Sequence, residues 1–278
     1  LAPIVTNTND GFNRLVPGFE APVCVVTSLG HTYEIPSRNR SVLVGLIRDI
    51  DKPKSLRFEL RSPNPLSNKY LVIAGCYQTI KAIADLKQFD TKLLEAELSK
   101  APSDKGFYLE EGRAYRDENN IFNYYTLEER NARFGQPPRT VYEAMLAFET
   151  YPEKLKSLTQ GAVFTEAIID SFKVGSLDKW KKKLSSRIID RNIRLLTSFV
   201  KLHSHENMDA IDEVMWDAIE QIKYDLMKNT LKGPSIYGMI KSAIDVGNYK
   251  EASDLQIEAK KKMEEIQQLY VNYKKNIF

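Results

Sequence analysis

The residues best suited to chemistry lie in segment 55–61, which reads Ser-Leu-Arg-Phe-Glu-Leu-Arg. Side chains in a β-strand alternate between two faces, so Arg57, Glu59 and Arg61 would share one face of such a strand. A planar guanidinium group matches the oxygens of phosphates and carboxylates. Two guanidinium groups beside one carboxylate make this segment a candidate functional site. An exposed ladder of surface ion pairs is the alternative.

Strands and breaks dominate the first 65 residues, whereas helical spacing dominates the rest. Apolar runs and alternation predict strands over 21–28, 41–50 and 55–61, and the apolar period becomes helical from Leu66. We therefore expect an α+β fold, in which a short antiparallel sheet over residues 20–61 precedes a mainly α-helical region that ends in a helical bundle. The predicted domains are 1–175 and 176–278.

The helical region divides into segments by its apolar spacing and its breaks. A polar stretch over 102–138 predicts a long irregular excursion. Thr165 is a predicted N-cap. The predicted helices cover 66–86, 140–149, 153–158, 165–172, 176–202, 210–227, 235–246 and 250–275.

Composition limits the function classes. The 278 residues are 42% hydrophobic, enough for a substantial core, and 40 basic residues against 37 acidic ones give a net charge of only +3. That balance argues against a general nucleic-acid surface. No apolar run reaches the length of a membrane span, and Cys24 and Cys76 indicate free buried thiols. We expect a cytoplasmic protein with no membrane or nucleic-acid partner.

Four motifs occur in an order that resembles the C-terminal part of the catalytic domain of glutamine synthetase. The resemblance continues weakly through 161–165 and fades near Leu184. The motifs are Arg-Leu-Val-Pro-Gly-Phe-Glu-Ala-Pro-Val at 14–23, Ser-Arg-Asn-Arg-Ser at 37–41, Arg-Phe-Glu-Leu-Arg at 57–61 and Pro-Asn-Pro-Leu-Ser-Asn-Lys-Tyr at 63–70.

The resemblance implies a ligase that joins ammonia to glutamate through a γ-glutamyl phosphate made from ATP. By that resemblance, Arg40 would hold the transferring phosphoryl group and Arg57 would lie beside the nucleotide, while Arg14 and Arg61 would bind the carboxylates of glutamate. These assignments suit a reaction that depends on positioning and on charge stabilisation. The implied substrates are glutamate, ammonia and ATP.

Two carboxylates complete the implied site. Glu59 would be one ligand of the Mg²⁺ or Mn²⁺ ion nearer the ATP phosphates. Glu20, which follows Pro17-Gly18, would be the flap carboxylate that covers the intermediate and takes a proton from ammonium. Closure of the flap would also keep water away from the acyl phosphate.

The pattern also departs from the family. Gly45 stands where the family usually has a second nucleotide-side arginine, and residues 29–36 resemble an insertion. The family's other metal ligands and its main ATP-binding segment would precede Leu1. Because one carboxylate cannot hold two octahedral ions, we expect this chain alone to be inactive and to bind no cofactor. We interpret it as the C-terminal piece of a longer, homo-oligomeric synthetase.

The competing interpretation is a non-catalytic homologue that acts through protein contacts of its helical bundle. Smaller signals favour structural roles over binding sites. The pair His203 and His205 indicates an exposed hinge between helices, the lysines of 179–183 indicate a solvated helix face, and Trp216 indicates bundle core.

Overall fold

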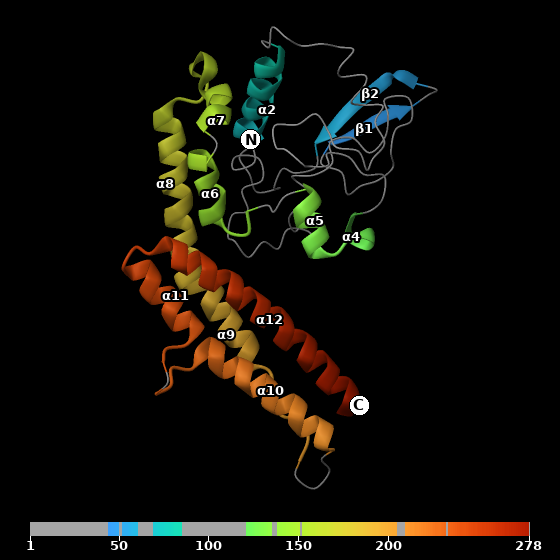
Figure 1. Ribbon diagram of the computed structural model, residues 1–278, viewed down its shortest axis with the longest axis vertical. Helices are drawn as coiled ribbons and strands as arrows, with labels where there is room; N and C mark the ends of the chain where they lie inside the picture. The colour runs from blue at the N-terminus through green and yellow to red at the C-terminus, as the bar shows by residue number, and fades with distance from the viewer. Residues whose placement is uncertain are drawn as a thin grey trace. The chain divides into compact units, whose positions relative to one another are not determined.

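The computed structural model of the chain comprises two compact units (Figure 1). Described residues of the first unit fall within 44–139 and 146–170, and those of the second, here called the bundle unit, within 140–145 and 171–277. The structure describes residues 44–49, 52–60, 69–84, 121–134, 138–150, 152–204, 209–231 and 233–277.

The predicted α+β fold class is wrong for the part of the chain that the structure describes. That part is mainly helical, and its strands form one two-stranded ribbon rather than a sheet over 20–61. The predicted strand over 21–28 lies outside the described residues. Two strands alone do not make a stable layer, whereas the helical period that begins near residue 66 continues to the end of the chain.

The strand pair covers the segment with the strongest alternation. Strand β1 (Val44–Asp49) runs antiparallel to β2 (Lys52–Leu60), with Asp49 opposite Lys52 beside a two-residue connection. The register is irregular between Ile47 and Asp49, where one residue of β1 faces residues 53–56 of β2, so the extra residues lie in β2.

Helices of the first unit follow the ribbon along the chain. They are α2 (Lys69–Ala84), α4 (Ile121–Tyr124), α5 (Leu127–Phe134) and α7 (Pro152–Thr159), with parts of α6 (Val141–Thr150) and α8 (Glu166–Lys182).

The predicted irregular excursion over 102–138 is therefore partly wrong, because it contains α4 and α5. Thr126 and Glu129 form a capping box at the start of α5, in which each backbone N–H donates to the other side chain, at 2.8 and 3.2 Å. The pattern Thr-x-x-Glu is the sequence signal of this helix start.

Helix α8 is longer than its sequence indicated. The predicted N-cap is confirmed, because the Thr165 hydroxyl accepts the Ile168 N–H at 3.3 Å. The helix then continues past the expected break near residue 175, through a π-helical stretch, η3 (Lys183–Ile188), into α9 (Ile189–Thr197). A single glycine such as Gly175 costs only about 1 kcal/mol in a helix and does not have to end it.

The last three helices agree closely with the sequence. They are α10 (Ala210–Met227), α11 (Ile236–Asp245) and α12 (Tyr249–Ile277). Asp209 and Ser235 cap α10 and α11 with their side chains. Gly247, at φ +77°, makes the left-handed turn between α11 and α12 that a glycine adopts without strain.

The core of the bundle unit lies where α12 packs against α10 and α11. Trp216 is buried there, as predicted, and Trp180 of α8 is fully buried although lysines surround it in the sequence. No helix among the described residues is long and apolar enough to span a bilayer. The largest fully buried side chains are Trp180, Leu184, Ile189, Leu196, Ile219, Leu226, Ile240, Gln256, Ile266 and Tyr273.

Candidate functional site

The structure places two of the six predicted site residues, Arg57 and Glu59, and describes their backbone within β2. The other four, Arg14, Glu20, Arg40 and Arg61, lie outside the described residues. The geometry of the whole predicted site therefore stays a prediction.

The strand register adds one relation that the sequence did not provide. Glu59 pairs directly with Gly45 across the ribbon, and Arg57 pairs with Ile47. Opposite residues of an antiparallel pair have Cα atoms about 4.5–5.5 Å apart. The position where the family usually has an arginine is therefore the direct cross-strand neighbour of the candidate metal ligand.

A divalent metal needs more ligands than the described residues bring together. Among the residues that the structure places, no group of three or more His, Cys, Asp or Glu side chains is arranged to hold a metal ion. Mg²⁺ requires about six oxygen ligands, of which Glu59 would be one. The described residues alone do not fit the metal that the resemblance implies.

Helix α2, which follows the last motif, is fixed to the end of α7 by a buried glutamine. The Gln78 amide donates to the carbonyl of Leu158 at 2.9 Å and to the carbonyl of Gln160. Cys76, on the same helix, is a half-buried free thiol, and burial raises its pKa above the ordinary value. A thiol of raised pKa is poorly nucleophilic, which favours a structural role.

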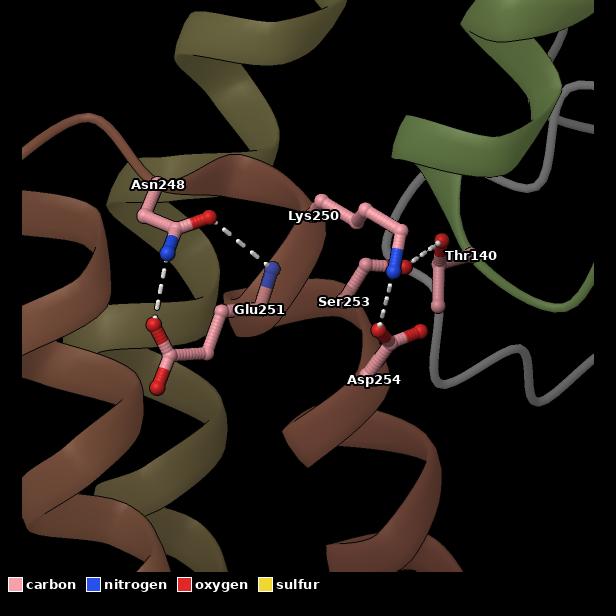
Figure 2. Close-up of polar contacts among 6 residues, drawn as sticks. All are labelled: Thr140, Asn248, Lys250, Glu251, Ser253 and Asp254. Carbon is pink, nitrogen blue, oxygen red and sulfur yellow. Dashed lines mark hydrogen bonds and ion pairs between the residues drawn. The ribbon is translucent and has the colours of Figure 1, made fainter.

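A polar seam lies at the start of α12 in the bundle unit (Figure 2). The hydroxyls of Thr140 and Ser253, both buried, share a hydrogen bond of 2.6 Å, and Thr140 also accepts the Glu143 N–H at the start of α6. Just before Ser253 in the chain, the side chain of Asn248 caps α12 and donates to Glu251 at 2.6 Å. These contacts fix the first turns of α6 and α12.

One turn further along α12, Gln256 lies wholly inside the core. Its Oε1 accepts the indole N–H of Trp180 at 2.7 Å. The amide nitrogen of Gln256 is buried, with no hydrogen-bond partner among the residues that the structure places. The Trp180 ring also stacks against Tyr142, at 6.2 Å between centroids.

The predicted hinge at His203 is held by the end of α12. The hydroxyl of Tyr273 accepts the backbone N–H groups of Leu202 and His203, at 2.7 and 3.2 Å, and lies 2.7 Å from Nδ1 of His203. With both N–H groups donating to it, the hydroxyl directs its own proton to Nδ1. His203 is therefore half-buried and hydrogen-bonded rather than exposed, and His205 lies outside the described residues.

Sequence reasoning did not find the buried roles of Gln78, Gln256 or Trp180. The available signal was weak: Gln256 occupies a core position in a helix whose neighbouring buried residues include Ala252 and Ala259. A glutamine at a core position indicates a buried hydrogen bond, because an unpaired amide there is costly.

The beginning of the chain is similar to known proteins. Residues 1–82 match the family described as glutamine synthetase, catalytic domain. Glutamine synthetase of Streptomyces filamentosus is 30% identical over 165 residues, which cover 59% of this chain and 28% of that protein. The enzyme of Frankia alni is 42% identical over 68 residues, 24% of this chain and 13% of that protein.

The aligned part of the chain thus covers at most 28% of the length of these two relatives. No solved structure matches it significantly. The matched residues 1–82 contain all six candidate site residues in the order that the motifs predicted. Through this N-terminal part, the chain is similar to part of the catalytic domain of glutamine synthetases.

Proposed function

We propose that residues 1–82 supply part of the active site of an ATP-dependent glutamate–ammonia ligase. In this proposal Arg14 and Arg61 bind the glutamate carboxylates, Arg40 holds the transferring phosphoryl group and Arg57 lies beside the nucleotide. Planar guanidinium groups suit these tasks because they donate two parallel hydrogen bonds to a carboxylate or phosphate.

The two carboxylates would act on the cation and on ammonium. Glu59 would contribute one oxygen ligand to a divalent ion, which supplies charge stabilisation to phosphoryl transfer when bound. Glu20 would close over the intermediate and accept a proton from ammonium. The observation that carries the proposal is the family match over 1–82, because it contains each of these residues.

The chain alone should lack ligase activity. The aligned part covers at most 28% of the relatives compared, and the additional metal ligands would lie in the remainder of such a protein. We propose that this chain is part of a longer cytoplasmic protein that assembles as a homo-oligomer, with glutamate, ammonia and ATP as substrates and Mg²⁺ or Mn²⁺ as the metal.

The test compares this chain with the full product of its gene. With glutamate, ATP, Mg²⁺ and hydroxylamine, the purified chain should form no γ-glutamyl hydroxamate, whereas the full product should form it. Hydroxamate formation by the isolated chain at the rate of an intact synthetase would refute the claim of inactivity. A full product that is inactive with either metal would refute the ligase assignment.

A second candidate is a non-catalytic homologue that acts through its bundle. It is favoured by the buried core of the bundle unit within 171–277, which lies outside the matched residues 1–82. The reading frame upstream of Leu1 discriminates between the two. Metal carboxylates and a glycine-rich segment with a histidine support the ligase, and an unrelated domain supports the interaction module.

A further inference from the structure

A row of cations runs along the continuous helix α8–η3–α9 of the bundle unit. Lys179, Lys183, Arg187, Arg191 and Arg194 follow one another at spacings of three or four residues, and each is exposed or half-exposed. We call these five residues the basic ridge. Each of the first four immediately precedes a buried residue; these are Trp180, Leu184, Ile188 and Asn192. The ridge therefore borders the core-facing side of the helix.

The ridge is largely unneutralised within the bundle unit. Among the residues that the structure places, Lys179, Lys183, Arg187 and Arg194 form no ion pair, and Lys181 alone of this lysine-rich segment does so, with Asp178. Like charges three or four residues apart on one helix repel each other. A partner of opposite charge along the ridge would remove that repulsion.

An acidic row of matching spacing lies on α10. Glu213, Asp217 and Glu220 are exposed or half-exposed, and within the described part of the chain they too form no ion pair. Each immediately follows a buried residue; these are Asp212, Trp216 and Ile219. Val214, next to Glu213 at the start of the row, is 70% exposed.

The two rows carry opposite charges at the same spacings of three or four residues. At about 1.5 Å per residue, the acidic row spans about 10 Å and would cover about half of the ridge, which spans roughly 22 Å from Lys179 to Arg194. Charged residues that border a buried helical seam are the ones that choose partner helices in coiled coils. The helix best matched to the ridge is therefore one with acids at the corresponding border positions, and α10 of another copy has them.

We propose that this protein self-associates through its bundle unit, with the basic ridge of one copy lying along the acidic row of a second copy. A polyanion such as RNA is the less suited partner, because the whole chain has a net charge of only +3. This contact does not depend on the proposed ligase activity.

Sedimentation of the full chain with two complementary double variants tests the proposal. One variant reverses the ridge, Lys183→Glu with Arg187→Glu, and the other reverses the acidic row, Asp217→Lys with Glu220→Lys. Each variant alone should associate at least about tenfold more weakly than the wild type, because attraction becomes repulsion. An equimolar mixture of the two should associate again, because each ridge then meets a row of opposite charge.

A control variant changes the net charge equally elsewhere. Lys241→Glu with Lys261→Glu alters exposed residues of α11 and α12 outside the ridge and should leave association unchanged. Association of the wild type should weaken as salt rises. Restoration in the mixture also shows that both variants fold.

Three results would overturn the proposal. These are a wild type that stays monomeric at high concentration, an association that both variants leave unchanged, and a mixture that fails to associate. Binding of polyuridylic acid by a monomeric wild type through the same ridge would replace the second copy by a nucleic-acid partner.

Discussion

Replacing Tyr273 by phenylalanine removes one oxygen atom that makes three hydrogen bonds in the bundle unit. That hydroxyl accepts the N–H groups of Leu202 and His203 and bonds Nδ1 of His203, and the Tyr273 side chain is fully buried. Each intramolecular hydrogen bond contributes about 0.5–1.5 kcal/mol net, so Tyr273→Phe should lower the free energy of unfolding by about 3 kcal/mol.

Tyr270→Phe is the matched control, on the same helix and with the same atom removed. The Tyr270 hydroxyl makes only long bonds, at 3.3 and 3.4 Å, to the exposed backbone of Val200. Its stacking on Phe199, at 4.3 Å between ring centroids, is kept by a phenylalanine. The control should therefore cost less than about 1 kcal/mol.

The assay is urea unfolding followed by tryptophan fluorescence. The chain has two tryptophans, Trp180 and Trp216, both in the bundle unit, so the signal reports that unit. With an m-value of about 1–3 kcal/mol per molar urea, Tyr273→Phe should lower the midpoint by about 1–3 M. Equal midpoints for the two variants would refute the reasoning that the buried hydroxyl holds the connection between α9 and α10.

Three further predictions concern the same unit. Gln256→Leu and Trp180→Phe should each lower the free energy of unfolding of this unit by about 1–3 kcal/mol. The double variant should lose less than the sum of the two single losses, because neither partner is then left unpaired. Additive losses in a double-mutant cycle would contradict this. Burial raises the pKa of Tyr237 to about 12. The neutral phenol therefore stabilises the fold below pH 10, and this contribution of about 2–3 kcal/mol is lost as pH rises from 10 to 12. Unfolding measurements on Tyr237→Phe across that range should not show this loss of stability. A hydrogen bond from Lys262, at 2.8 Å, lowers the pKa of Asp225. The Asp225 carboxylate therefore stabilises the fold above about pH 4, and this stabilisation is lost as pH falls further. Lys262→Met should make stability depend less on pH in that acid range, and an unchanged dependence would contradict the assignment.

The helices of the bundle unit were the most predictable part of the fold. Their apolar residues recur every three or four positions, and caps at Asp209 and Ser235 mark the starts of α10 and α11. The continuity of α8 through Gly175 was not predictable from these signals, because a glycine weakens a helix without ending it. Buried polar pairing, as between Trp180 and Gln256, depends on residues 76 positions apart that no local pattern connects.

The predicted fold class failed for a different reason. Apolar β-branched runs before residue 61 indicated a sheet, yet the described strands form one ribbon, because strand propensity says little about how many neighbours a strand has. The candidate site depended on motif order, which the family match over 1–82 supports. The pairing of Gly45 with Glu59 came only from the strand register.

Hydroxamate formation by the full gene product with Glu59→Gln tests the central claim most directly. The control is Glu128→Gln, which changes an exposed carboxylate of α5 outside the matched residues. If Glu59 is a metal ligand, its variant should lose at least about a hundredfold in activity and require more Mn²⁺, because removing a catalytic charge costs several kcal/mol. The Glu128 variant should match the wild type. Full activity of the Glu59 variant at the same metal concentration would contradict the placement of this strand in a ligase active site.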